Sequence, residues 1–248
     1  MIITLLTDFG TADGYVGEMK GVLASQAPAT PLIDISHDLP AHDVDAGRLA
    51  LARYWRRFPV GTVHLVVVDP GVGSTRACIA VQSQGRHLVG PDNGVLSPAL
   101  LVGDARVVAL SVPTSASATF HGRDILAPAA AALANGVAFD TLGSPVIAPH
   151  VRRTPEARRL DDGGIGGEVI SIDRFGNAIT NLMTLRPGGW IEVAGRVLPL
   201  VRTYADVALG EAAALTGSSG LIEIAVREGS AASSLGVARG TAVVLRRE

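Results

Sequence analysis

The sequence has little that would crosslink, charge or anchor the chain. Its single cysteine, Cys78, excludes an intrachain disulfide and fits a reducing compartment. Only 4% of the residues are aromatic and the formal net charge is −2, whereas nucleic-acid grooves need basic and stacking side chains. No apolar run approaches the ~20 residues that span a bilayer, and the first residues lack the features of a signal peptide. We therefore expect a cytoplasmic protein without nucleic-acid or membrane partners.

The predicted elements divide the 248 residues into two parts. Strand and helix patterns alternate over residues 1–150, which favours an α/β domain with a largely parallel sheet. Residues 151–162 form a charged, proline-containing linker. From 163 to 248, short apolar runs alternate with turn signals, which favours a smaller antiparallel β-barrel. The pair Ala194-Gly195 predicts a hairpin turn in this second domain.

The segment from Leu65 to Arg76 carries the strongest indication of a site. Its apolar, β-branched start predicts a buried strand that stops at Asp69, where proline and glycines bend the chain. Open α/β sheets bind ligands beyond the carboxyl ends of their strands. From this segment alone, a loop-capping Asp69 paired with Arg76 at the surface is an equally good interpretation. Cys78 follows on the next predicted strand, where we expect a small buried hydrophobe.

Other turns also carry reactive side chains. Asp8 ends the first strand, and His121 precedes an alanine-rich helix, where a histidine is available for acid–base or electrostatic work. In the second domain, Asp173 to Asn177 joins two strands. The turn holding Ser218 and Ser219 offers hydroxyls and backbone donors that suit a carboxylate, although an ordinary turn has the same composition.

Several common chemistries lack their motifs. The sequence has no dinucleotide-binding glycine fingerprint after a strand, no phosphate-binding P-loop and no nucleophile elbow. The histidines and aspartates between His37 and Asp43 lack a recognised metal-ligand spacing, and Asp43 suits the start of a helix. We therefore predict no metal site.

Five segments together resemble one family. They are Thr7–Gly10, Asp69–Gly73 with Arg76, Gly90–Gly94, Phe120–Asp124 and Asp173–Asn177, in this order. The chain is similar to the S-adenosyl-L-methionine (SAM) hydroxide adenosyltransferases, or adenosine-forming SAM hydrolases, which are relatives of the SAM-dependent fluorinase and chlorinase. The resemblance implies attack of water or hydroxide at ribose C5′ of SAM, with SAM as substrate and no separate cofactor. It also implies a homotrimer with sites between subunits.

The resemblance further implies roles for single residues. Asp69, Arg76 and His121 match the residues that handle the water, and Asp8 matches the acid that holds the ribose hydroxyls. The amino-acid and adenine ends match Asp173, Asn177, Ser218 and Ser219. The halogenating relatives carry an aromatic residue at the position of Asp69, so hydrolysis is favoured here. A SAM-dependent halogenase and a non-catalytic SAM or adenosine sensor are the alternatives.

The identity of the base is open at this stage. A carboxylate beside an arginine is a weak base, because the cation stabilises its charged form. In one hypothesis, His121 accepts the proton and Asp69 orients it. In the other, Arg76 and His121 stabilise a bound hydroxide while Asp69 fixes their geometry.

Overall fold

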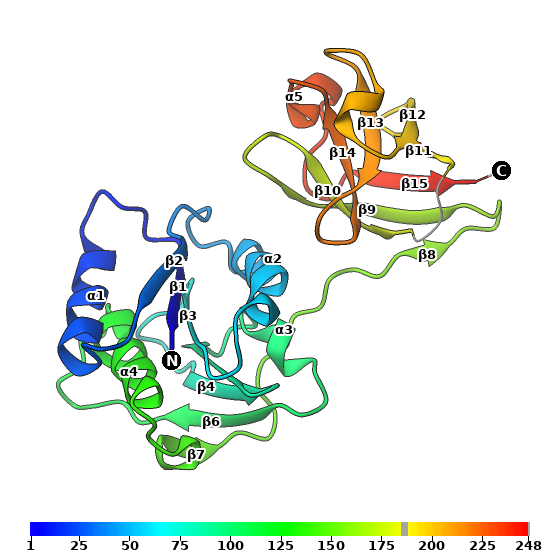
Figure 1. The fold of residues 1–248 in the computed structure, drawn as a ribbon. Helices are drawn as coiled ribbons and strands as arrows, with labels where there is room; N and C mark the ends of the chain where they lie inside the picture. The colour runs from blue at the N-terminus through cyan, green and yellow to red at the C-terminus, as the bar shows by residue number, and fades with distance from the viewer. Residues whose placement is uncertain (185–187, 248) are drawn as a thin grey trace. The chain divides into compact units, whose positions relative to one another are not determined.

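The computed structural model describes residues 1–184 and 188–247 (Figure 1). The chain divides into two compact units, Met1–Arg152 and Arg153–Glu248. The domain limits expected from the sequence, 1–150 and 163–248, stay a prediction.

The first unit is built on a seven-stranded mixed sheet of order β2-β1-β3-β5-β4-β6-β7. The strands β2, β1, β3 and β5 run parallel, and β4, β6 and β7 pair antiparallel. The α/β class is confirmed, with the parallel strands gathered in one half of the sheet. The strands are β1 (Ile3–Thr7), β2 (Leu32–Ser36), β3 (Val63–Val67), β4 (Cys78–Ser83), β5 (Arg86–Pro91), β6 (Arg106–Leu110) and β7 (Gly143–Pro145).

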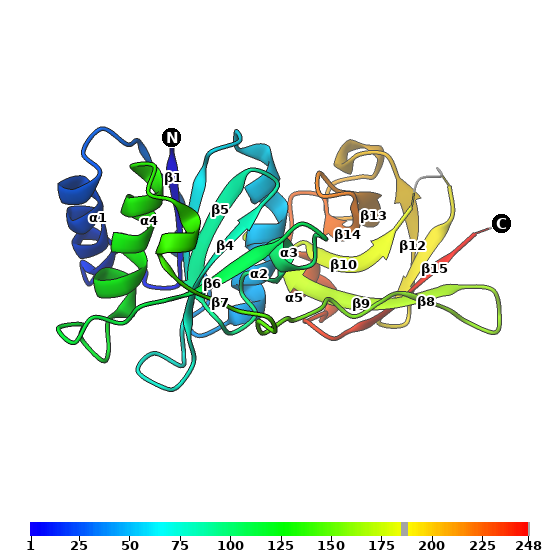
Figure 2. The ribbon, with the colours of Figure 1, turned by 90° about the horizontal axis from the view of Figure 1, so that it is seen from below.

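Helices cover both faces of this sheet (Figure 2). One face packs against α1 (Tyr15–Gln26) and α4 (Ala127–Ala134), and the other packs against α2 (Val44–Tyr54) and α3 (Ser97–Leu100). The side chain of Asp43 caps α2 by accepting the N–H of Ala46 at 2.9 Å, as its place in the sequence suggested. In the described residues, no helix combines the length and the hydropathy needed to cross a membrane.

Short helical turns complete this unit. They are η1 (Trp55–Arg57), the π-helical η2 (Gly122–Leu126) and η3 (Phe139–Thr141). The alanine-rich helix predicted after His121 therefore begins with a π turn, and its α-helical part starts at Ala127. Such turns are rare and frequently mark functional sites.

The carboxyl edge of the parallel strands brings two loops side by side. Strands β2 and β3 lie on opposite sides of β1, so the strand order reverses at β1. Thr7 at the end of β1 pairs in register with Val67 at the end of β3. The loops that begin at Asp8 and Val68 therefore leave the sheet together, at the kind of switch point where α/β sheets bind ligands.

The second unit is a closed barrel of seven strands. Its order is β10-β14-β13-β12-β11-β15-β9, a pairing of β9 with β10 closes it, and β8 extends the edge of β9. All pairs are antiparallel except β12 with β13, which confirms the predicted barrel. The strands are β8 (Arg158–Arg159), β9 (Ile165–Ile172), β10 (Ala178–Met183), β11 (Trp190–Val193), β12 (Arg196–Val201), β13 (Ala212–Thr216), β14 (Leu221–Val226) and β15 (Ala242–Arg246).

Local sequence explains some of these elements better than others. The hairpin predicted at Ala194-Gly195 joins β11 to β12, with φ of +48° and +70° at its two central residues. Strand β13 was not predicted, because its alanine-rich sequence carries no strand pattern and its pairing with β14 defines it. The helical pieces are η4 (Tyr204–Asp206) and α5 (Ala231–Leu235).

Candidate functional site

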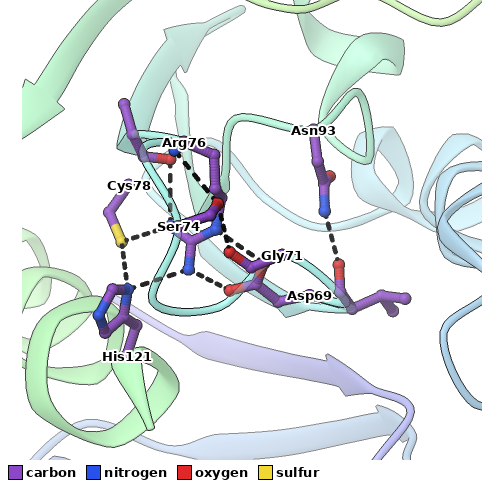
Figure 3. Close-up of polar contacts among 9 residues, drawn as sticks. Asp69, Gly71, Ser74, Arg76, Cys78, Asn93 and His121 are labelled. Carbon is purple, nitrogen blue, oxygen red and sulfur yellow. Dashed lines mark hydrogen bonds and ion pairs between the residues drawn. The ribbon is translucent and has the colours of Figure 1, made fainter. Parts of the chain in front are cut away.

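The loop after β3 holds a buried ion pair (Figure 3). The Nε of Arg76 donates to Oδ1 of Asp69 at 2.7 Å, and its Nη2 donates to Oδ2. The side chains are only 5% exposed for Asp69 and 10% exposed for Arg76. This two-pronged geometry fixes the guanidinium plane against the carboxylate. The pair is therefore not the exposed surface pair that the sequence left open.

A glycine and two side-chain hydrogen bonds to backbone carbonyls hold this loop in place. Gly73 has a φ of +77°, and a Cβ there would collide with the carbonyl of Ala118, so only glycine lets the loop approach the segment before His121. The Oγ of Ser74 donates to the carbonyl of Gly71 at 2.7 Å. The side-chain amide of Asn93 donates to the carbonyl of Val68 at 2.9 Å, immediately before Asp69 (Figure 3).

His121 and Cys78 complete the cluster around Arg76 (Figure 3). His121 stands directly before the π turn η2, is 8% exposed, and has its Nδ1 3.0 Å from Nη2 of Arg76. The Sγ of Cys78, at the start of β4, lies 3.1 Å from Nη1 of Arg76 and 3.8 Å from Nδ1 of His121. The structure thus brings Asp69, Arg76 and His121 together and adds Cys78, which the sequence indicated only as a buried hydrophobe.

The contacts determine the tautomer of His121. A guanidinium can only donate, so Nδ1 of His121 accepts from Arg76 and the neutral ring carries its proton on Nε2. Burial and the charge of Arg76 lower the pKa of His121, and the carboxylates of Asp69 and Asp124 oppose this only in part. At neutral pH the ring is therefore neutral and presents an N–H donor from Nε2.

Asp8 lies at the same sheet edge, on the neighbouring loop. Its Oδ2 accepts the backbone N–H of His42 at 2.7 Å, and His42 has a left-handed φ of +66°. The ring of Phe9 packs edge-on to Phe120 at 5.9 Å between centroids, which links this loop to the segment of His121. Four of the predicted site residues thus share one edge of the first unit.

The second unit holds the other predicted residues, beginning with the turn between β9 and β10. The Oδ1 of Asp173 accepts the backbone N–H groups of Phe175 and Asn177, each at 2.9 Å. Its Oδ2 accepts the side-chain amide of Asn177 at 3.0 Å. Phe175 stands at the turn with 76% of its surface exposed. The sequence analysis gave Phe175 no role, although an aromatic residue between two polar site candidates is a usable signal.

Ser218 and Ser219 lie exposed on a separate turn, between β13 and β14. A Cβ at the neighbouring Gly217 would collide with the carboxylate of Glu223, so this turn sits against Glu223. Tyr204 donates its hydroxyl to Oε1 of Glu223. Burial, the bond to Glu223 and the nearby charge of Asp173 raise the pKa of Tyr204 to about 12. The sequence analysis missed both, although a glutamate inside the apolar run of β14 was a visible signal.

Metal-ligand geometry is not found in the described part of the chain, where no group of three or more histidine, cysteine or acidic side chains could hold an ion. His37 is buried, with its Nδ1 2.8 Å from the hydroxyl of Thr7 and its Nε2 3.0 Å from Asp34. These contacts hold the end of β1, from which the loop of Asp8 leaves, against the end of β2.

Comparison with known proteins gives consistent matches along the chain. Residues 3–143 match the SAM hydroxide adenosyltransferase N-terminal domain, and residues 167–244 match the C-terminal domain of that name. A protein named (R)-S-adenosyl-L-methionine hydrolase from Thermus thermophilus is 42% identical, with 98% of each chain covered. One of the same name from Salinispora tropica is 41% identical over 96% of this chain and 95% of its own.

More distant relatives and solved structures extend this picture. A fluorinase from an Actinoplanes species is 25% identical, with 90% of each chain covered. The crystal structure of an uncharacterized conserved protein from Thermotoga maritima superposes with a TM-score of 0.91 at 32% identity, covering 99% of this chain and 100% of that one. The fold of this chain is thus shared with the Thermotoga maritima structure.

Proposed function

Because the chain belongs to the SAM hydroxide adenosyltransferase family, we propose that it is an enzyme that hydrolyses SAM to adenosine and L-methionine. SAM is the substrate, and no separate cofactor takes part. The observation that carries this proposal is the buried cluster of Asp69, Arg76 and His121 at the carboxyl edge of β3.

The reaction sets a positioning problem more than an activation problem. A water oxygen forms a bond to C5′ of the ribose while the C5′–S bond breaks. The electron pair of that bond goes to sulfur, which leaves as the neutral thioether of methionine, and the water releases one proton to the solvent. Since the sulfonium leaves readily, the enzyme gains most by holding the oxygen about 3–3.5 Å from C5′ and in line with sulfur.

The cluster geometry favours the second hypothesis in one respect: His121 stabilises the nucleophile rather than accepting its proton, and Arg76 acts through His121. If His121 took a proton on Nδ1, it would lose the bond from Arg76 and place a second cation 3.0 Å from the guanidinium. We therefore assign His121 the role of a donor, whose Nε2–H stabilises the negative charge on the attacking oxygen. Asp69 holds Arg76 and accepts an O–H of the water with a remaining lone pair.

The other predicted residues would bind the substrate. Asp8 takes the ribose hydroxyls. Asp173 accepts three hydrogen bonds inside its turn, which leaves about one of its four lone-pair sites for the methionine ammonium. Asn177 reads the adenine edge, and Phe175 offers the adenine an exposed aromatic face. Ser218 and Ser219 hold the methionine carboxylate.

We further propose a cytoplasmic homotrimer in which each site combines the first unit of one subunit with the second unit of another. Support comes from the resemblance and from the placement of the two residue sets in different units. Mixing an Arg76→Ala variant with an Asp173→Ala variant tests this. Refolded mixtures should recover part of the activity that each variant lacks, whereas mixtures as inactive as their components would contradict shared sites.

The products of the reaction test the function itself. Purified protein is incubated with each sulfonium epimer of SAM, in buffers with and without chloride, and the products are separated by chromatography. We expect adenosine and methionine, preferentially from the (R) epimer for which the hydrolase relatives are named. The product 5′-chloro-5′-deoxyadenosine would instead identify a halogenase, and tight binding without turnover would identify a sensor.

A further inference from the structure

Arg76 uses its whole hydrogen-bonding capacity inside the protein. A guanidinium has five N–H donors, and here they meet Oδ1 and Oδ2 of Asp69, Nδ1 of His121, the carbonyl of Ala77 and Sγ of Cys78. No donor remains for a bound water. Arg76 therefore acts on the reaction through the groups that it holds, and the placement of its plane decides where His121 points.

We propose that Cys78 is a positioning residue for this reaction: its sulfur fixes the guanidinium of Arg76, and through it the Nε2–H tautomer of His121. This role rests on the proposed function. The sulfur contacts both partners: it lies 3.1 Å from Nη1 of Arg76 and 3.8 Å from Nδ1 of His121. These contacts restrict the orientation of the guanidinium plane and of the imidazole ring. Cys78 is 2% exposed, so water cannot replace it as an acceptor for Arg76.

The thiol contacts both Arg76 and His121, and both contacts favour the same tautomer of His121. Its sulfur accepts the N–H from Nη1 of Arg76, and its S–H points a weak donor toward Nδ1 of His121. Burial raises the pKa of Cys78 in spite of the nearby Arg76, so the proton stays on sulfur at neutral pH. Nδ1 of His121 thus faces two donors, which keeps its own proton on Nε2, the atom that is to meet the nucleophile.

Loss of the sulfur should affect catalysis more than binding. In Cys78→Ala, one buried N–H of Arg76 has no acceptor, which favours a rotation of the guanidinium away from His121. The charged groups acting on His121 are Arg76, Asp69 and Asp124. With Arg76 displaced, the lowering of the His121 pKa by its charge weakens, and the histidine protonates at a higher pH.

The test compares kcat, KM and the pH profile of four proteins. For Cys78→Ala we expect kcat to fall on the order of tenfold with KM for SAM unchanged. The acid limb of its profile should move up toward the ordinary histidine pKa of about 6.5. Cys78→Ser keeps an acceptor and a donor, so we expect it to have the wild-type kcat and the wild-type acid limb. The matched control is Val81→Ala, a truncation on the same strand with its side chain in the other core, which should destabilise the fold without moving the acid limb.

Three results would overturn the proposal. They are a Cys78→Ala variant with wild-type kcat and acid limb, a Cys78→Ser variant as impaired as Cys78→Ala, and an equal shift of the limb in Val81→Ala. A further measurement needs neither turnover nor a variant. It therefore still tests the role of Cys78 if the variants fail to fold or if the proposed function is wrong. In ¹⁵N-histidine NMR of the wild type, His121 should show a bare Nδ1 and a protonated Nε2, and the reverse tautomer would refute the role of Cys78 whatever the substrate is.

Discussion

The two units of the molecule each place an aspartate in a polar cluster, and they do so in opposite ways. Asp69 meets a cation, Arg76, and that cation reaches His121 across 45 positions of sequence. Asp173 is held by N–H groups within four positions of itself. The first cluster exists only when the whole first unit is folded, whereas the second is a local turn. A geometry fixed by tertiary packing suits chemistry, and a turn whose carboxylate is held by N–H groups suits the binding of a cation.

The sharpest way to break this contrast is Asp69→Asn. The amide keeps the shape but loses the charge that holds Arg76, and one of its ends turns an N–H toward the guanidinium. We expect kcat to fall about 10²–10³-fold, with the dissociation constant for SAM little changed. Steady-state kinetics and calorimetric binding measure the two quantities. A variant that loses binding and retains kcat would reverse the roles given to the two units.

The two units should also differ in how their stability changes at acid pH. All six histidines lie in the first unit, and His64 is fully buried against the hydroxyl of Thr4. Burial lowers the pKa of His64 to about 4 from an ordinary 6.5. The unfolded chain therefore binds this proton first, and the stability from the neutral ring is full above pH 6.5 and is lost as the pH falls toward 4.

This single site should lower the free energy of unfolding of the first unit by about 3 kcal/mol across that range. Urea unfolding at a series of pH values measures it, with His64→Leu as the variant that removes the titration. The variant should show a flatter pH dependence than the wild type. Equal slopes in the two proteins would mean that His64 does not titrate as its burial implies.

The binding role of the second unit is tested by Asp173→Asn. The side-chain oxygen of asparagine still accepts the N–H groups of Phe175 and Asn177, so the turn should persist while the charge is gone. We expect KM for SAM to rise about tenfold at an unchanged kcat, which corresponds to the loss of one charge-assisted hydrogen bond. Asp173→Ala, which removes the turn as well, should be worse. An unchanged KM in Asp173→Asn would exclude the carboxylate from substrate binding.

Tyr204→Phe should give the smallest effect. It removes the hydrogen bond to Glu223 and leaves the ring, which is 42% exposed. The carboxylate that loses this bond belongs to Glu223, which is only 9% exposed, so we expect a loss of about 1–2 kcal/mol of stability and a change in KM of about twofold. Thermal unfolding and steady-state kinetics measure both. A tenfold or larger rise in KM would place Tyr204 and Glu223 in the substrate site itself.

The same contrast explains what could be predicted from the sequence. The strand before Asp69 was predictable because a β-branched run ends at Pro70, and the turn at Asp173 was predictable because its partners are neighbours in the chain. Strand β13 was not, since alanines form a strand there only through pairing with β14. The burial of Cys78 was foreseen, but its contacts were not. They depend on Gly73 bringing the loop of Arg76 against the segment before His121, which no local pattern encodes.

The most direct test of the whole account is the fate of oxygen. The protein is incubated with SAM in ¹⁸O-enriched water that also contains chloride, and the nucleoside product is analysed by mass spectrometry. If the cluster of the first unit aims a water at C5′, the adenosine formed will carry the heavy oxygen at its 5′ position. Adenosine without the label, or 5′-chloro-5′-deoxyadenosine in its place, would contradict the account.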